Sequence, residues 1–266
     1  MRLVCPVSFA ILTLASCSAL HADQLDTVSN NFLLANGGGG ASATLNNSLN
    51  IEIFNVDFAN DIIVPHNNYS ANLTALTSFG FTAGTARFGN NTSWRTVTLS
   101  DDATDGGSDD AADSAIINAA NALGRYQMAA YLVSQYNLAG GGNAANNGIQ
   151  TAIWELLDPS SYVLAPFSAD PSSALEQAAI WFSLTSTAAR DSYLMDYRIV
   201  SDTTMQACGV VACGGFQEQI TASVTVTPVP EPKSAYLLLM VLFAVLATGF
   251  HKRRSASRMI GCSRQI

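Results

Sequence analysis

The spacing of hydrophobic residues changes character twice along this chain. Residues 49–58, 71–77 and 93–99 are partly alternating and rich in β-forming side chains, which is typical of strands. From residue 111 to residue 189 apolar positions recur every three or four residues, which is typical of helices. Strand-like patterns return at residues 193–200 and at residues 219–226. The order predicts an α+β fold whose strands form a sandwich or a barrel, with about three inserted helices.

Turn-forming residues set the limits of those elements. The first helix, or pair of helices, covers residues 111–137 and precedes a run of three glycines. The second covers residues 149–157, and the third covers residues 170–189 with Asp170 as its N-cap. Residues 30–50 are rich in Asn, Gly, Ser and Ala, which predicts a flexible loop or a broad hairpin tip.

The first 22 residues have the pattern of an export leader. Arg2 precedes an apolar stretch, and the small residue Ala22 offers a cleavage site before Asp23. A second interpretation is open, because the residues ending at Cys17 resemble a lipobox, which would make Cys17 a lipidated N-terminus. We expect cleavage after Ala22.

The other end of the chain has the pattern of a membrane anchor. Residues 235–250 form an apolar run at the short limit of a transmembrane helix, and Lys252, Arg253 and Arg254 follow it. Because positive flanks stay on the cytoplasmic side, residues 23–227 are expected to be an exported domain and residues 259–266 a cytoplasmic tail.

Residues 228–258 resemble the PEP-CTERM sorting signal of Gram-negative bacteria. The motif residues Val229, Pro230, Glu231 and Pro232 are followed by the apolar run and then by the basic cluster. The resemblance implies processing by an exosortase, removal of the tail, and delivery to the cell envelope or to extracellular polysaccharide. Residues 255–266 depart from it, since such tails usually end soon after the basic cluster. An ordinary single-pass anchor is the alternative.

The exported domain is strongly acidic. The whole chain has a net charge of −8, but residues 23–227 hold nineteen Asp and Glu against five Arg and no Lys. Such a surface repels phosphate backbones, so nucleic acid is excluded as a partner. It suits an extracellular protein that meets polysaccharide or divalent cations.

Residues 101–113 hold six aspartates and two glycines. Clustered carboxylates next to glycine favour calcium, although the spacing does not fit an EF-hand. The alternative is a solvated acidic loop before the N-terminus of the next helix. The weak calcium candidates are Asp101, Asp102, Asp105, Asp109 and Asp110.

Two cysteines belong to the exported domain for certain. Cys208 and Cys213 are separated by four residues, and an oxidising compartment favours a disulfide between them. A metal site would need two further soft ligands, which are not nearby in the sequence.

Residues 50–200 also resemble, more faintly, bacterial surface thioester domains. In those adhesins a helical Gln forms a thioester with a Cys on an early strand. Gln150 matches the Gln, and Trp154 matches an aromatic position after it, but Asn55 stands where the Cys would be. The resemblance implies a related fold without the covalent chemistry. Packing within a helix is the plainer role for Gln150 and Trp154.

Candidates for catalysis are few. His66 is the only certain histidine of the exported domain, and its turn-like context indicates an exposed loop residue. Glu155 and Asp158 could form a carboxylate pair, as in glycosidases, but they lie at an expected helix end. We therefore expect a non-enzymatic envelope or matrix protein that needs no cofactor. An adhesin-like binding module on a degenerate thioester scaffold is the alternative, and a carbohydrate hydrolase is the third hypothesis.

Overall fold

The computed structural model describes residues 22–33, 38–57, 66–99, 110–137, 144–157, 169–203 and 216–222. All of them belong to the first of two compact units, Met1–Val224. The second unit, Thr225–Ile266, lies outside the described residues, and so does the whole expected sorting signal. The leader before Ala22, the pair Cys208 and Cys213, and the aspartates of residues 101–109 also lie outside them.

Six antiparallel strands close into a barrel in the order β1-β2-β3-β6-β5-β4. The sequence left a sandwich and a barrel open, and the barrel is what forms. Closure gives every described strand a hydrogen-bonded neighbour on each side. The strands are β1 (Asp23–Leu33), β2 (Gly39–Leu45), β3 (Leu49–Asn55), β4 (His66–Ala75), β5 (Arg198–Asp202) and β6 (Gln219–Ala222).

Small and branched apolar side chains fill the barrel interior. In β2 the inward positions Ala41, Ala43 and Leu45 alternate with the more polar Ser42 and Thr44. A narrow barrel needs such small residues because its two walls are close together. The cluster consists of Leu25, Ala41, Ala43, Leu45, Ile51, Ile53, Ala71, Val200 and Phe216.

The hairpin between β2 and β3 turns on two asparagines. Asn46 and Asn47 have φ values of 53° and 56°, in the left-handed region that Asn tolerates better than other residues with side chains. Asn46 also accepts a hydrogen bond from the backbone N–H of Gln24 at 2.9 Å. The turn sets the register in which Leu45 faces Leu49.

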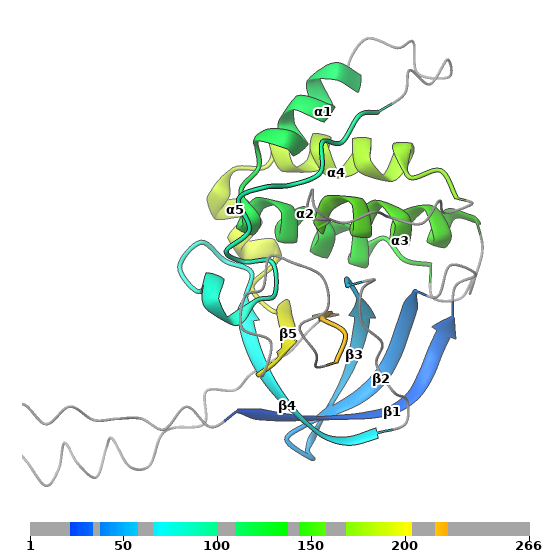
Figure 1. Ribbon diagram of the computed structural model, residues 1–266, viewed down its shortest axis with the longest axis vertical. Coiled ribbons are helices and arrows are strands. Elements are labelled where there is room, and N and C mark those ends of the chain that lie inside the picture. The colour runs from blue at the N-terminus through cyan, green and yellow to red at the C-terminus, as the bar shows by residue number, and fades with distance from the viewer. Residues whose placement is uncertain are drawn as a thin grey trace, which may run out of the picture. The chain divides into compact units, whose positions relative to one another are not determined.

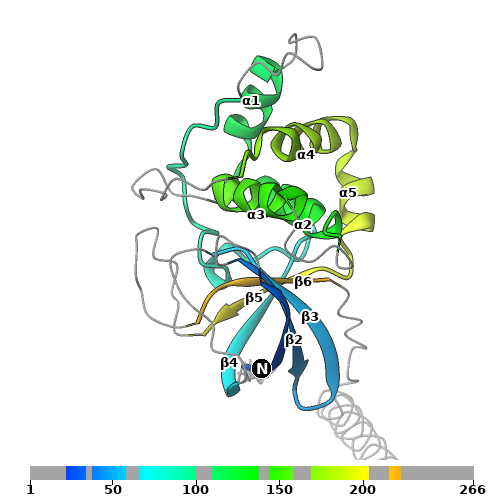
Figure 2. The same ribbon diagram turned by 90° about the vertical axis from the view of Figure 1, so that its right-hand side faces the viewer.

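The helices are inserted between β4 and β5 and lie over one end of the barrel, with α2 and α3 nearest to it (Figures 1 and 2). The α+β class and the inserted helical block are therefore confirmed. α2 packs against α3 and α4 and contacts β6. The elements are η1 (Ala83–Thr85), α1 (Asp110–Ala119), α2 (Ala122–Ser134), α3 (Ala144–Leu157), α4 (Ser172–Leu184) and α5 (Thr187–Tyr193).

Two of the three expected helices are each divided by a cap. Asn121 ends the first part of the 111–137 segment, because its side chain accepts a hydrogen bond from the N–H of Gly124 at 2.9 Å and starts α2. Ser186 does the same for Ala189 at 3.3 Å and starts α5. The described block thus has four longer helices and the short α5, rather than three.

The prediction of a strand at residues 93–99 is wrong. The backbone groups of Val97 and Leu99 bond to side chains of α1. Asn118 accepts from the N–H of Val97 and donates to its carbonyl, both at 2.9 Å, and Ser114 accepts from the N–H of Leu99 at 3.0 Å. Helix side chains, rather than a neighbouring strand, therefore satisfy backbone groups in a segment that is rich in β-forming residues.

Of the flexible loop or broad hairpin tip expected at residues 30–50, the flexible loop is wrong, because the described part is mostly the strands of two antiparallel hairpins. β1 continues to Leu33 and all of β2 falls within that range. His66 opens β4 rather than sitting in a turn. The late strand expected from residue 193 begins only at Arg198, because Tyr193 still belongs to α5.

None of the helices in the described ranges combines the length and the hydropathy needed to cross a membrane. The expected span, residues 235–250, lies outside those ranges.

Candidate functional site

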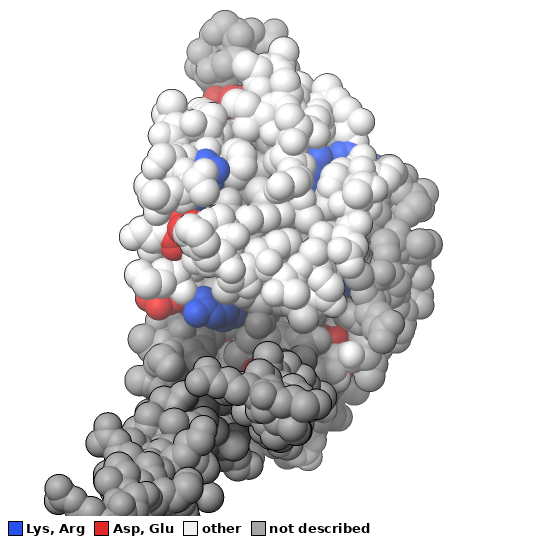
Figure 3. Space-filling model, turned by 90° about the vertical axis from the view of Figure 1, so that its left-hand side faces the viewer, with Lys and Arg blue, Asp and Glu red and all other residues white. Residues whose placement is uncertain are grey.

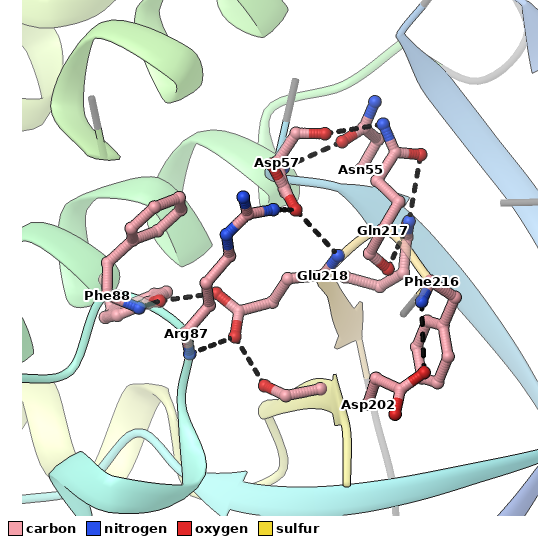
Figure 4. Close-up of polar contacts among 11 residues, drawn as sticks. Asn55, Asp57, Arg87, Phe88, Asp202, Phe216, Gln217 and Glu218 are labelled. Carbon is pink, nitrogen blue, oxygen red and sulfur yellow. Dashed lines mark hydrogen bonds and ion pairs between the residues drawn. The ribbon is translucent and has the colours of Figure 1, made fainter. Parts of the chain in front are cut away.

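Glu218 is the centre of a buried polar cluster where the helices meet the barrel. Its carboxylate accepts hydrogen bonds from the backbone N–H of Arg87 at 2.7 Å, from the hydroxyl of Tyr126 and from the hydroxyl of Ser201 (Figure 4). The side chain is fully buried. One carboxylate thus joins the segment after η1, helix α2 and strand β5. We call Asp57, Arg87, Tyr126, Ser201 and Glu218 the junction network.

Arg87 and Asp57 form the ion pair of this network. One terminal nitrogen of the Arg87 guanidinium donates to Oδ2 of Asp57, and both side chains are at most 1% exposed. The same carboxylate oxygen lies 3.5 Å from the backbone N–H of Glu218 (Figure 4). The guanidinium carbon also lies 5.0 Å from the centroid of the Phe88 ring. Asp57 lies two residues after the last residue of β3, Asn55, so the ion pair fixes that end of the strand.

Burial governs the protonation of the junction network. It raises the pKa of Glu218, against the opposing effect of the hydrogen bonds from Arg87, Ser201 and Tyr126 and the charge of Arg87. Burial and the nearby Glu218 carboxylate raise the pKa of Tyr126 well above its ordinary value. Tyr126 therefore keeps its proton and acts as a donor to Glu218, while its oxygen accepts the N–H of Phe88 at 3.0 Å.

The junction network has the residue types of an acid–base site but no access to solvent. A general acid or base must reach the proton that it transfers. The side chains of Asp57, Arg87, Tyr126 and Glu218 are at most 1% exposed. Their hydrogen bonds are directed at one another, so the arrangement holds strands, helix and loop together rather than facing a substrate.

A second buried contact joins the two positions that the thioester resemblance pairs. Gln150 lies in the middle of α3, and its Nε2 donates to the backbone carbonyl of Asn55 at 2.9 Å. Its Oε1 accepts from the N–H of Gly39 at 3.1 Å and from the hydroxyl of Tyr136 at 2.9 Å. The side chain of Asn55 turns back on its own segment, where Oδ1 accepts the N–H of Asp57 at 2.8 Å. The structure thus brings Asn55 and Gln150 together.

The space around Gln150 is tight. A Cβ atom on Gly38 would lie 2.4 Å from Cγ of Gln150 and 2.5 Å from its Cδ, so only glycine fits there. Burial raises the pKa of Tyr136 well above its ordinary value, which keeps its hydroxyl a donor to Gln150. Tyr136 in turn stacks on Phe54 with a centroid distance of 5.5 Å. The amide of Gln150 is therefore fixed from three sides.

Arg125 is a buried cation with weaker compensation. It donates to the carbonyl of Leu156 at 2.9 Å, in the last turn of α3, and its guanidinium carbon lies 4.9 Å from the Trp94 centroid. Within the described ranges no carboxylate forms an ion pair with it, and burial lowers its pKa to about 10. The carbonyl end of a helix carries a partial negative charge. Arg125 thus caps α3 through a helix dipole and a ring face.

The remaining candidates from the sequence are scattered. Asp110 and Asp113 occupy the first turn of α1. A position near the start of a helix is what the alternative to calcium predicts for these acidic residues. Glu155 is half-buried on α3, whereas Asp158 lies outside the described residues. Nothing is described of the His66 side chain. Within the described part of the chain no three His, Cys, Asp or Glu side chains gather as a metal site would require.

Sequence reasoning missed Arg87, Tyr126 and Glu218. Arg87 carried a weak signal, because it is one of five arginines in the exported segment and sits between the apolar Ala86 and Phe88. Glu218 carried a similar one, as a rare Glu directly before the apolar alternation of β6. Neither signal indicates a partner, because the contacts join residues up to 161 positions apart.

Comparisons with family models, with curated proteins and with solved structures found no match to this chain.

Proposed function

We propose that this chain is a non-enzymatic protein of the cell envelope or extracellular matrix. The leader of residues 1–22 exports it, and the signal of residues 228–258 sorts it. The observation that carries the proposal is the order of Val229-Pro230-Glu231-Pro232, an apolar run and Lys252-Arg253-Arg254. An exosortase-type enzyme acts on this tail while the helix of residues 235–250 holds the protein in the inner membrane. The acidic domain then works in the envelope or outside the cell, next to polysaccharide.

The burial of the junction network supports a role without catalysis. Its two carboxylates, Asp57 and Glu218, are engaged in contacts that link strands, helix α2 and the segment after η1. On the face drawn in Figure 3, blue and red side chains lie scattered among uncharged ones, and the described atoms of that face form no broad basic patch. That supports the exclusion of nucleic acid as a partner.

The sorting motif can be tested in the native host. Pro230→Ala combined with Pro232→Ala should leave the tail uncleaved and the protein in the inner-membrane fraction. Pro228→Ala is the matched control, because it changes a neighbouring proline outside the Val-Pro-Glu-Pro motif and should be processed like the wild type. Normal processing of the double variant would contradict sorting by this motif.

A second candidate is an adhesin-like module that binds without covalent capture, on a scaffold related to thioester domains. The observation that favours it is the contact of Gln150 with Asn55, together with the two donors on the Gln150 carbonyl oxygen. For the third hypothesis, a hydrolase, Glu155→Ala and Asp158→Ala are decisive. If both variants retain any polysaccharide-hydrolysing activity of the wild type, Glu155 and Asp158 are not its catalytic carboxylates.

A further inference from the structure

Four aromatic side chains form a continuous row on the helical block. Tyr131 of α2 stacks on Trp181 of α4 with a centroid distance of 4.8 Å and an interplanar angle of 10°. Trp181 meets Tyr193 at 5.6 Å, and Tyr193 stacks on Tyr197 at 6.3 Å with an angle of 12°. We call Tyr131, Trp181, Tyr193 and Tyr197 the aromatic row. Three helices and the segment before β5 thus contribute rings to one surface.

The aromatic row faces solvent, unlike the Phe54–Tyr136 stack in the core. Tyr193 is 44% exposed, and the other three rings are half-buried. Two apolar residues close to the row in the sequence are also exposed, Leu184 at 81% and Met195 at 57%. Contiguous exposed apolar surface is uncommon on soluble proteins and commonly marks a binding surface.

The charged residues beside the row are mostly bound within the protein. Arg190 donates to the carbonyls of Phe182 and Thr185 and to Oε1 of Gln127, and it stacks over the Phe182 ring at 4.1 Å. Asp191 accepts from both the N–H and the hydroxyl of Ser78. Neither charge is presented to a polyanion or a polycation.

Arg198 is engaged in the same way, since it donates to the carbonyls of Met195 and Tyr197. The polar groups that the row does offer are hydroxyls. Tyr193 and Ser134 share a hydrogen bond at 2.8 Å, the side chain of Tyr197 also bonds to Ser134, and Tyr131 carries a further phenol group. Asp196, next to Tyr197 in the sequence, is exposed and carries a carboxylate acceptor.

We propose that the aromatic row binds a neutral polysaccharide. A pyranose ring has an apolar C–H face that packs on aromatic rings, and its hydroxyls need donors and acceptors at the edge, which phenols and a carboxylate supply. Charge selects a neutral chain, because the acidic domain repels polyanions and the two arginines beside the row, Arg190 and Arg198, are engaged within the protein. The inference rests on the proposed function, whose polysaccharide contact it assigns to this surface.

The test is affinity electrophoresis of the full-length chain in gels containing dextran or hydroxyethylcellulose as neutral probes and alginate as the polyanion. Neutral polymer should retard the wild type, and alginate should not. Tyr193→Ala and Trp181→Ala should each weaken the apparent Kd about tenfold. Tyr193→Phe keeps the ring and should retain most of the retardation. Phe79→Ala is the matched control, because Phe79 is 98% exposed but outside the row.

Three results would overturn the inference. The first is no retardation by either neutral polymer. The second is retardation that survives both Tyr193→Ala and Trp181→Ala, which would place polysaccharide binding elsewhere. The third is self-association of the purified chain that depends on Tyr193, which would make the row an interface between copies. None of these results concerns the sorting of the tail. The proposed function is tested separately, by the processing of the double variant at Pro230 and Pro232.

Discussion

Nε2 of Gln150 lies 2.9 Å from the backbone carbonyl oxygen of Asn55, although the two residues are 95 positions apart in the sequence. One amide side chain therefore links the middle of helix α3 to the end of strand β3. Because the Gln150 carbonyl accepts two further hydrogen bonds, its position is fixed, and the barrel and the helical block share a rigid contact.

Gly38 should be intolerant of a side chain because of this contact. Gly38→Ala would place a Cβ atom 2.4 Å from Cγ of Gln150, and moving Gln150 would break its hydrogen bonds. We expect a loss of about 2 kcal/mol in the free energy of unfolding, measured by urea denaturation. Gly84→Ala is the control, since nothing lies within 4 Å of a Cβ there, and it should be near neutral. Equal stability of the two variants would show that the Gln150 site is loosely packed.

The ion pair of Asp57 and Arg87 should behave as a coupled unit. Removing one partner leaves a charge buried, so Asp57→Asn or Arg87→Met should each cost about 3 kcal/mol in the free energy of unfolding. The double variant should lose clearly less than the sum of the two losses. Additive losses in the double-mutant cycle would mean that the two side chains do not interact in solution.

Glu218 should give the unfolding free energy a distinctive pH dependence. Because burial raises its pKa in the folded state above the ordinary value of 4.5, the native protein binds this proton more tightly than the unfolded chain does. The stability that it contributes is fully present below pH 4.5 and is lost as the pH rises through the raised pKa. Glu218→Gln should remove this fall, as seen in chemical denaturation across that pH range.

The groups facing Glu218 are Arg87, Tyr126 and Ser201, with Asp57 behind the guanidinium. Other carboxylates also titrate in this range, so the informative quantity is the difference between the wild type and the variant. Glu52→Gln, at an exposed position of β3, provides the control for loss of one surface charge. Identical pH profiles for the wild type and Glu218→Gln would contradict a raised pKa.

Gln150 should be chemically inert in the wild-type chain. A thioester needs a thiolate that attacks Cδ of Gln150, forms a C–S bond and expels ammonia, and position 55 carries Asn. Methylamine should therefore leave the intact mass unchanged. A methylamine adduct on Gln150 would instead demonstrate reactive chemistry and revive the covalent adhesin.

The scaffold itself can be tested for the adhesin-like alternative by Asn55→Cys. If the barrel and helices retain thioester geometry, the variant should lose the mass of one ammonia, and methylamine should then add to Gln150. Asn55→Cys combined with Gln150→Met serves as the control, because it has no side-chain amide at position 150 from which ammonia could be expelled. An unchanged mass for Asn55→Cys would speak against a thioester-type scaffold.

The sequence predicted the helical block well because its apolar residues repeat strongly. Residues 149–157 fall within α3, and of the single helix or pair left open for residues 111–137 the pair is what forms, divided at Asn121. The division at Ser186 was not predicted, because a single capping residue interrupts an otherwise continuous pattern. Strands β1 and β2 were missed for the opposite reason. Their small and polar residues have low β-propensity, and only closure into a narrow barrel makes Ala41 and Ala43 good wall residues.

The junction network lay beyond the reach of sequence patterns. Arg87, Tyr126 and Glu218 lie in three segments whose spacing in the sequence holds no period, and each is unremarkable alone. By contrast, the pairing of Asn55 with Gln150 could be suggested from the sequence, because a resemblance supplied the geometry that periodicity lacks.

We propose that the acidic domain is exported and then released from its tail, and that it works in the envelope or matrix. The most direct measurement is the intact mass of the mature protein from its native host, together with its cell fraction. We predict a chain that lacks residues 1–22 and everything beyond about Pro232, recovered from the envelope or the extracellular material. A protein with an intact tail in the inner membrane would contradict the claim and make this an ordinary anchored protein.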